Sequence, residues 1–489
     1  MAPKKSAPSE ALRLPVKLDA VSNGEFFPRP RPSRIQLVQR LAMERSLENA
    51  RKKGLSRREY LSSTCGVATV FLTMNQVLGC AGGRYAIENG AGLDDDAARE
   101  ALTGDEFVFD VQTHRVSTHR PWYEHNDAFK EFVGEDAPQG DCGRDPFTLC
   151  FTADDFYREV FLNSDTAIAV LSALPGVGKA NPLHIQEAEE TRETLARMEG
   201  SPRLLLHSIV MPNRSRVDEA LDDMNAVAEQ YDLAAWKLYP IWEAGDRGYW
   251  LSDEETGMRV AERARALGIR TMAVHKGLPL GDHDPTFTRS QDVGPAARAN
   301  PDLTYLIYHS GYEPEHEEGP YDPDADKGID VLIRSLAENG IGPDGNVYAE
   351  LGSTWYEVMG NPDEAAHVLG KLLASLGEDR ILWGTDSIWY GSPQDQIQAF
   401  RTFEITPEFQ ERYGYPPLTA RAKRKILGLN AARVYGIDPG QVSPVLARDP
   451  IGRIKEARGG ITPSTVGTYG PRTRREMLAF LRSNGGRPH

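Results

Sequence analysis

Apolar and polar positions follow a repeating pattern from residue 105 onward. Short runs rich in Val, Ile, Leu and aromatic residues alternate with segments whose apolar residues recur at helical spacing. The runs are apolar throughout, which is typical of parallel strands covered on both faces. The predicted strands are 107–112, 168–173, 203–209, 233–239, 271–275, 303–309, 346–351 and 381–386. The predicted helices between them include 184–200, 216–232 and 361–377.

Eight strands alternating with helices predict an α/β fold, a (β/α)8 TIM-like barrel with N-terminal and C-terminal extensions. A doubly wound open sheet is the alternative. Such a sheet more often carries a glycine-rich phosphate loop after its first strand, and "DVQTHRV" has none. The glycines of "LPGVGKA", 174–180, lack the full phosphate-binding spacing and are interpreted as a loop. The barrel is expected over residues 105–438.

Polar residues stand near the ends of the predicted strands, although their burial costs free energy. In a barrel the carboxyl ends of all strands meet at one mouth, where catalytic groups lie. A single histidine after an apolar run is more often structural than a ligand, but the recurrence predicts a site. Histidine together with carboxylate indicates zinc, manganese or iron. The residues are Gln112, His114, Ser172, His207, Lys237, His275, His309, Glu350 and Asp386.

Several motifs resemble the amidohydrolase superfamily, and most closely its amidohydrolase-related branch of metal-dependent hydrolases and nonoxidative decarboxylases. They are "FDVQTH", "AWKLYP", "TMAVHKG", "LIYHSG" and "ILWGTDSIW", followed by "AKRKILGLNAARVYGI". The resemblance implies one divalent metal ion, expected to be zinc with manganese or iron as alternatives, held by His114, His275 and Asp386. The family's first strand normally supplies a His-x-His pair. Gln112 departs from this pattern. It is expected either to be a weak ligand or to contact the ligands without touching the metal.

The resemblance also implies a reaction. The expected enzyme is a metal-dependent hydrolase that cleaves an ester, lactone or amide bond of a small organic substrate with a metal-activated water. Asp386 is the expected proton acceptor, His309 orients the carbonyl group, and Lys237 contacts a substrate carboxylate or developing negative charge. The predicted substrate-binding residues are Lys237, His207, Tyr239, Glu350 and Trp355. Further aromatic candidates for the pocket wall are Trp242, Tyr312, Tyr356 and Trp389.

Two other functions stay open at this point. A nonoxidative decarboxylase of an aromatic or unsaturated acid, a lyase, would use the same residues. A catalytically decayed barrel that acts as a binding protein is the second alternative, and Gln112 is its best support. A binuclear centre bridged by a carboxylated Lys237 would need a stronger ligand than glutamine at position 112.

Charge and cysteine content limit the partners. The formal net charge of the 489-residue chain is −15, which argues against nucleic acid or an anionic membrane surface, because both attract clustered Lys and Arg. The expected partner is therefore a small-molecule substrate, and a homo-oligomer stays open. No cysteine lies in a CxxC pair, so a zinc ribbon is not expected. Cys142 and Cys150 are near enough in sequence for a disulfide, with two free thiols as the alternative.

The N-terminal extension, residues 1–55, is expected to have little order over 1–35 and an amphipathic helix over 35–54. Residues 56–83 resemble a twin-arginine export signal, with Arg57-Arg58 ahead of a moderately apolar stretch and a cleavage option after Ala81. This signal predicts a periplasmic protein that uses the twin-arginine machinery. The alternative is a helix packed on the domain of a cytoplasmic protein.

Two further segments adjoin the predicted strands. Residues 313–330 form an acidic, proline-containing stretch after the sixth strand and are expected to be a loop or lid over the mouth. Residues 439–489 form the C-terminal extension, in which 471–486 has the pattern of a short amphipathic helix.

Overall fold

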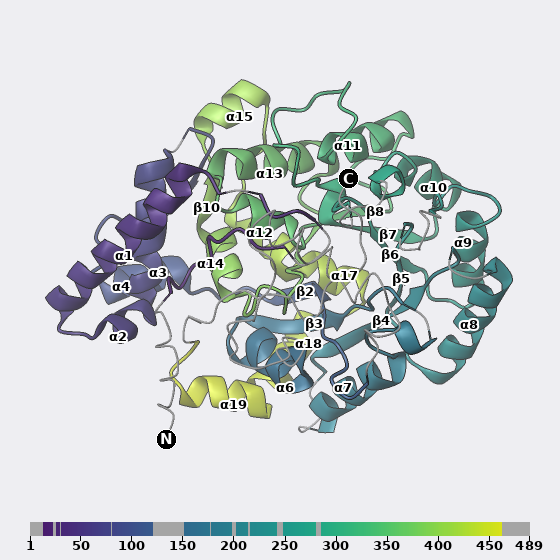
Figure 1. Ribbon diagram of the computed structural model, residues 1–489, viewed down its shortest axis with the longest axis horizontal. Coiled ribbons are helices and arrows are strands. Elements are labelled where there is room, and N and C mark those ends of the chain that lie inside the picture. Colours follow the sequence, from purple (N-terminus) through teal and green to yellow (C-terminus); the bar gives the residue numbers. More distant parts are fainter. Residues whose placement is uncertain are drawn as a thin grey trace, which may run out of the picture.

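The computed structural model describes residues 13–22, 26–29, 31–79, 81–120, 151–176, 178–197, 202–213, 216–241, 248–279 and 285–461. Eight parallel strands form one sheet in the order β2 to β9 (Figure 1). Their bounds are β2 Val108–Thr113, β3 Thr166–Leu171, β4 Leu204–Val210, β5 Ala235–Leu238, β6 Thr271–His275, β7 Thr304–Tyr308, β8 Val347–Glu350 and β9 Ile381–Leu382. Backbone hydrogen bonds from Val111 to Trp383 (3.0 Å) and from Asp386 to Gln112 (2.9 Å) close the sheet. The predicted (β/α)8 barrel is confirmed.

Helices follow the strands and form the outer layer of the barrel (Figure 1). The predicted helices 184–200, 216–232 and 361–377 correspond to α7, α8 and α13. In α13 two carboxylates occupy the first turn, where the helix dipole favours negative charge, and Gly377 follows with a φ of 73°. The bounds are α7 Ile185–Arg197, α8 Val217–Gln230, α9 Gly257–Ala266, α10 Val293–Ala299, α11 Ile329–Glu338, α12 Thr354–Val358, α13 Pro362–Leu376, α14 Gln394–Thr402, α15 Pro407–Tyr413 and α16 Ala420–Arg424.

The amino ends of the strands are closed by the last described helices. These are α17 Asn430–Val434, α18 Pro439–Arg448 and α19 Pro450–Ala457. Arg203, just before β4, donates to the Leu446 carbonyl at 2.8 Å and pairs with Asp449. Leu446 also belongs to the apolar cluster that includes Phe109 and Ile168 of the barrel. The first part of the C-terminal extension is therefore the floor of the barrel, while the helix predicted at 471–486 lies outside the described residues.

A layer of N-terminal helices packs on one side of the barrel (Figure 1). The helix predicted at 35–54 is confirmed as α1. Arg57 and Arg58 open α2, which a capping box of Ser56 and Glu59 starts, and the apolar face of α3 is buried. The bounds are α1 Ser33–Lys53, α2 Arg57–Leu61, α3 Thr64–Leu78, α4 Asp95–Leu102, and the antiparallel pair β1 Gly83–Tyr85 and β10 Phe403–Ile405.

The segment that resembles an export signal is thus folded into this layer, as the alternative interpretation expects. Export itself stays a prediction. Within the described ranges, no helix has both the length and the apolar character that a membrane span requires.

Residues 13–22 and 26–29 form an N-terminal strap, the purple segment that runs from α1 toward α12 in Figure 1. The Lys17 ammonium pairs with Asp395 at 2.7 Å, and the Asp19 carbonyl accepts from the Tyr356 hydroxyl at 3.2 Å. Val16, Leu18, Val21 and Phe26 are buried. The expectation of little order over 1–35 is wrong for these residues, because their apolar side chains join the main core and Lys17 and Asp19 bond segments that follow β9 and β8.

The acidic segment 313–330 is anchored to an outer helix. The ammonium of Lys371, in α13, contacts Asp330 at 2.6 Å and also pairs with Glu318. All three side chains are buried, so each charge needs the opposite one beside it. The predicted lid is therefore fixed against α13 at these two points.

Candidate active site

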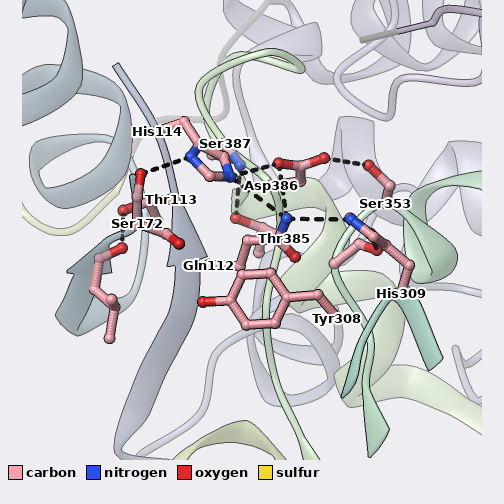
Figure 2. A network of polar contacts seen from close by, with 12 residues as sticks. Gln112, Thr113, His114, Ser172, Tyr308, His309, Ser353, Thr385, Asp386 and Ser387 are labelled. Carbon is pink, nitrogen blue, oxygen red and sulfur yellow. Dashed lines mark hydrogen bonds and ion pairs between the residues drawn. The ribbon is translucent and has the colours of Figure 1, made fainter. Parts of the chain in front are cut away.

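Four polar side chains meet at the mouth of the barrel, around the amide nitrogen of Gln112 (Figure 2). This Nε2 lies 3.1 Å from Asp386 Oδ1, 3.4 Å from His114 Nε2 and 3.5 Å from His309 Nε2. His114 Nε2 also lies 3.1 Å from Asp386 Oδ1. The structure therefore brings together Gln112, His114, His309 and Asp386, which come from the ends of β2 and β7 and from the segment after β9.

A buried carboxyl group fixes the backbone at this junction. Asp110, in β2, accepts from the backbone N–H groups of Gln112 and Thr385, both at 3.1 Å, and from the Thr385 hydroxyl. Burial raises the pKa of Asp110 to about 7. These bonds hold the end of β2 against the segment after β9. Asp386 there has a φ of 60°, a conformation that non-glycine residues adopt mostly at special positions.

Three imidazoles share one arrangement: each bonds a backbone carbonyl through one ring nitrogen. His114 Nδ1 lies 2.9 Å from the Ser172 carbonyl, His309 Nδ1 lies 2.7 Å from that of Gly352, and His275 Nε2 lies 3.0 Å from that of Leu278. A carbonyl only accepts, so the bonded nitrogen carries the hydrogen. In a neutral ring the other nitrogen then presents a lone pair.

Burial keeps two of these rings neutral. It lowers the pKa of His309 to about 4 and lowers the pKa of His275 well below its ordinary value, and the neighbouring His309 and Lys237 act in the same direction on His275. The rings of His275 and His309 meet edge to face, with centroids 4.8 Å apart. His275 Nδ1 is buried and has no hydrogen-bond partner in the described part of the chain.

Asp386 is held by a serine hydroxyl. Ser353 Oγ donates to Asp386 Oδ2 at 2.6 Å and lies 2.7 Å from the Tyr390 hydroxyl. Burial alone would raise the pKa of Asp386, but the neighbouring His114, His309 and Ser353 hold it below its usual range. The Tyr390 ring stacks on Tyr356, with centroids 4.0 Å apart, and Tyr356 in turn contacts the N-terminal strap.

The donor set fits a divalent cation. Among the described residues, no three His, Cys, Asp or Glu side chains are grouped to hold an ion as they stand. The Gln112 nitrogen occupies the point that His114, His309 and Asp386 share. The His114 lone pair and the Asp386 carboxylate are only 3.1 Å apart, which requires a proton or a cation between them. Imidazole lone pairs with a carboxylate are ligands that zinc, manganese and iron accept.

A buried cation and two tyrosines lie beside this group. The Lys237 ammonium, on β5, is 3.8 Å from the centroid of the Tyr308 ring and 4.4 Å from that of Tyr239. The Tyr239 ring stacks on His275 with centroids 5.1 Å apart. The predicted residues Lys237 and Tyr239 are thus placed next to His275, and Lys237 is fully buried.

His207 and Glu350, predicted to bind substrate, are engaged inside the protein. His207 Nε2 lies 2.9 Å from the Tyr435 hydroxyl and its Nδ1 lies 3.3 Å from that of Tyr308, so neither ring nitrogen is left for substrate. The Glu350 carboxyl accepts from the backbone N–H groups of His309 and Gly352. Burial raises the pKa of Glu350 well above its ordinary value. His207 therefore packs the barrel interior, and Glu350 positions His309.

Trp355 is also engaged elsewhere, because its indole N–H donates to the Gln396 carbonyl at 2.9 Å and its ring packs on Phe400. The predicted substrate contact is therefore wrong for Trp355.

The aromatic candidates divide in the same way. Trp389 stacks on His114 with centroids 5.8 Å apart and is well placed to wall the site. Tyr312 and Tyr356 bond the N-terminal strap instead. Trp242, Cys142 and Cys150 lie outside the described residues.

Ser353 and Tyr390 were not among the candidates. The prediction examined strand ends, whereas Ser353 lies three residues beyond Glu350 with a φ of 54°. The small residues of "ELGSTW" were the available signal, because an extended strand cannot continue through such a turn.

Comparisons with known proteins agree with this architecture. Residues 151–437 match the family model described as amidohydrolase. A comparison with curated proteins finds no match.

Three solved structures are similar at low identity. A 2,6-dihydroxybenzoate decarboxylase from Rhizobium is 13% identical, with 68% of this chain and 99% of that chain covered and a TM-score of 0.39. A Pseudomonas putida protein assigned as a 2-pyrone-4,6-dicarboxylic acid hydrolase is 15% identical, with 68% and 98% covered and a TM-score of 0.38. A 5-carboxyvanillate decarboxylase from Novosphingobium aromaticivorans, complexed with manganese and a nitrobenzoic acid, is 13% identical, with 69% and 99% covered and a TM-score of 0.42.

Proposed function

The chain belongs to the amidohydrolase family, and from this premise we propose that it is a metal-dependent hydrolase that cleaves an ester, lactone or amide bond of a small organic substrate. His114, His275 and Asp386 would hold one divalent ion, with Gln112 as a weak fourth ligand. Zinc is the first expectation, because imidazole and carboxylate are its usual ligands. When bound, the ion lowers the pKa of a water molecule and polarises a carbonyl group.

One observation carries the proposal: the ring nitrogens that do not bond carbonyls are kept for another partner. His114 Nε2 faces Asp386, and His275 Nδ1 has no hydrogen-bond partner within the described ranges. A purely structural histidine gains stability when both nitrogens are bonded, since an unsatisfied buried polar atom costs about 1–3 kcal/mol. A carbonyl that orients the ring and fixes its tautomer is the usual support of a metal ligand.

The residues of the chain divide the remaining work. Asp386 accepts the proton of the attacking water on Oδ1, while the Ser353 hydroxyl holds Oδ2 at 2.6 Å and fixes the plane of the carboxylate. His309, neutral and anchored on the Gly352 carbonyl, orients the substrate oxygen. Burial of the whole group excludes bulk water, which strengthens each of these interactions.

A nonoxidative decarboxylase is the second candidate, and Lys237 favours it. This buried ammonium between the rings of Tyr239 and Tyr308 suits a substrate that brings its own carboxylate and an aromatic ring. The proton that replaces the lost carboxyl group would be taken by Asp386 from a water molecule and passed to the substrate carbon, and the hydroxide left would combine with the released carbon dioxide as bicarbonate. The same residues would thus serve hydrolysis or decarboxylation according to the substrate.

Metal analysis of the purified full chain tests the proposal. The expected result is one tightly held transition ion per chain, and a chain without metal after growth in zinc, manganese and iron would favour the decayed binding protein. A panel of esters, lactones, amides and aromatic acids then separates the two reactions. Release of carbon dioxide from an acid, without hydrolysis of any ester, lactone or amide, would replace the hydrolase by the lyase.

A further inference from the structure

Gln112 directs its amide nitrogen into the donor set and its amide oxygen away from it (Figure 2). The nitrogen brings two N–H bonds to three acceptors, which are Asp386 Oδ1 and the Nε2 atoms of His114 and His309. The amide oxygen has no hydrogen-bond partner in the part of the chain that the structure describes. The amide therefore satisfies the surrounding lone pairs and leaves its own oxygen unsatisfied.

The reverse orientation suits an occupied site. Half a turn about the last side-chain bond exchanges an oxygen and a nitrogen of nearly the same size, so the packing hardly changes. Without a cation, this turn would put the amide oxygen against the Asp386 carboxylate, and two acceptors would repel each other. With a cation, the same oxygen becomes a ligand, because amide oxygens coordinate hard and borderline metals.

The outer side of the amide has the space and the partner for the turned nitrogen. A Cβ atom on Gly352 would lie 2.1 Å from Gln112 Oε1 and 2.7 Å from Glu350 Oε1, so only glycine leaves this volume open. The Glu350 carboxyl oxygen lies against the same spot. A nitrogen placed there would face Glu350 Oε1, which also accepts from the Gly352 N–H at 2.6 Å.

We infer that Gln112 is an occupancy-dependent switch: its nitrogen fills the site when no metal is bound, and its oxygen turns inward when a metal binds. The inference rests on the proposed function, because it concerns the same ion. Glutamine then stabilises the empty site and weakens the hold on the ion. A histidine or carboxylate at this position would bind the ion more tightly and leave the empty site less stable.

Two substitutions in the chelator-treated full chain separate these effects. Gln112→Met keeps the length of the side chain but removes the donors, so the metal-free Tm should fall by about 1–3 °C as the acceptors lose their partner. Gln112→Glu places a carboxylate beside Asp386, so the metal-free Tm should fall further. The same carboxylate should tighten zinc binding, measured by competition with a coloured chelator, about tenfold or more.

Gln396 provides the matched control. It is a buried glutamine in α14 whose amide atoms both lack hydrogen-bond partners among the residues described. Gln396→Met should not lower the metal-free Tm, and it should leave zinc affinity unchanged.

The outcomes distinguish the switch from the proposed function. A metal-free Gln112→Met protein as stable as wild type, or a Gln112→Glu protein that binds zinc no more tightly, overturns the switch even if wild type binds zinc. If neither the wild type nor any variant binds zinc, the proposed function and the switch are both refuted. A Gln112→Glu protein that has a lower metal-free Tm than wild type but binds zinc more tightly supports the switch.

Discussion

His309 and His207 are both buried in the same barrel, and burial lowers the pKa of both rings. They differ in their partners. His207 bonds the hydroxyls of Tyr308 and Tyr435, one on each nitrogen, whereas His309 bonds the Gly352 carbonyl through Nδ1 and faces the Gln112 amide nitrogen with Nε2. A hydroxyl can donate or accept, but a carbonyl fixes the tautomer and leaves a defined lone pair. The partner of a buried histidine, rather than its burial, therefore distinguishes a candidate ligand from a packing residue.

The largest expected effect comes from removing the carboxylate at the mouth. Asp386→Ala should lower kcat by about 10³-fold, because the proton acceptor and a metal ligand disappear together. Turnover on the substrate found by the panel and metal content after gel filtration measure the change. Asp386→Asn, which keeps the shape, is the control and should lose turnover to a similar extent. Full activity in either variant would contradict the site.

Removing the Ser353 hydroxyl should have a smaller effect on the same group. Ser353→Ala should lower kcat about tenfold, because the Asp386 carboxylate loses the donor that fixes its plane. Ser353→Gly also removes the hydroxyl but relieves the positive φ of this position. If Ser353→Ala and Ser353→Gly lose the same share of kcat although their stabilities differ, the loss comes from the orientation of the Asp386 carboxylate. A Ser353→Gly protein with wild-type kcat would refute this role.

The pH dependence of stability tests whether the buried His207 is neutral in the folded protein. Burial lowers the pKa of His207 well below its ordinary value. Below about pH 6.5 His207 is therefore protonated in the unfolded chain but stays neutral in the folded protein. The free energy of unfolding should therefore fall as the pH falls, by up to about 1.4 kcal/mol per pH unit from this residue. Urea unfolding of wild type and His207→Leu at pH 6.5 and 5.5 should show a shallower slope in the variant. Identical slopes would count against a neutral His207.

The smallest expected effect is a loss of stability without a loss of activity, at a residue near the amino ends of the strands. Tyr435→Phe removes one hydroxyl partner of His207 and should lower the free energy of unfolding by about 1 kcal/mol. Since Tyr435 touches none of the residues assigned to the reaction, kcat should not change. Urea unfolding and turnover are measured on the same preparation. A loss of kcat at unchanged stability would place this tyrosine in the reaction after all.

The barrel could be predicted from the sequence because each of its units is local. An apolar run and the amphipathic helix after it can be recognised within about 30 residues. Eight repetitions of this unit are compatible with few architectures. The N-terminal strap could not be predicted, because Lys17 finds its partner Asp395 only 378 residues later in the chain. A segment rich in Pro and Arg resembles a disordered one until that partner is known.

The site was predictable in part for a related reason. The resemblance named His114, His275 and Asp386 as metal ligands and His309 beside them. The structure places His114, His309 and Asp386 around Gln112, whereas His275 contacts the ring of His309. Strand position indicates where a side chain lies along the barrel, but it does not indicate what that side chain bonds. The predictions for His207, Glu350 and Trp355 depended on position alone, and their partners come from segments distant in sequence.

The N-terminal strap bears on the predicted cleavage after Ala81. The bond after Ala81, the predicted cleavage point, is held on both sides: the Ala81 carbonyl accepts from Thr406, and the Gly82 N–H donates to Asp363. A peptidase acting there would release everything up to Ala81, including the ammonium that neutralises Asp395. Loss of residues 1–81 would thus leave the buried Asp395 carboxylate without Lys17 and the Tyr356 hydroxyl without the Asp19 carbonyl, so the cleaved chain would be less stable than the full one.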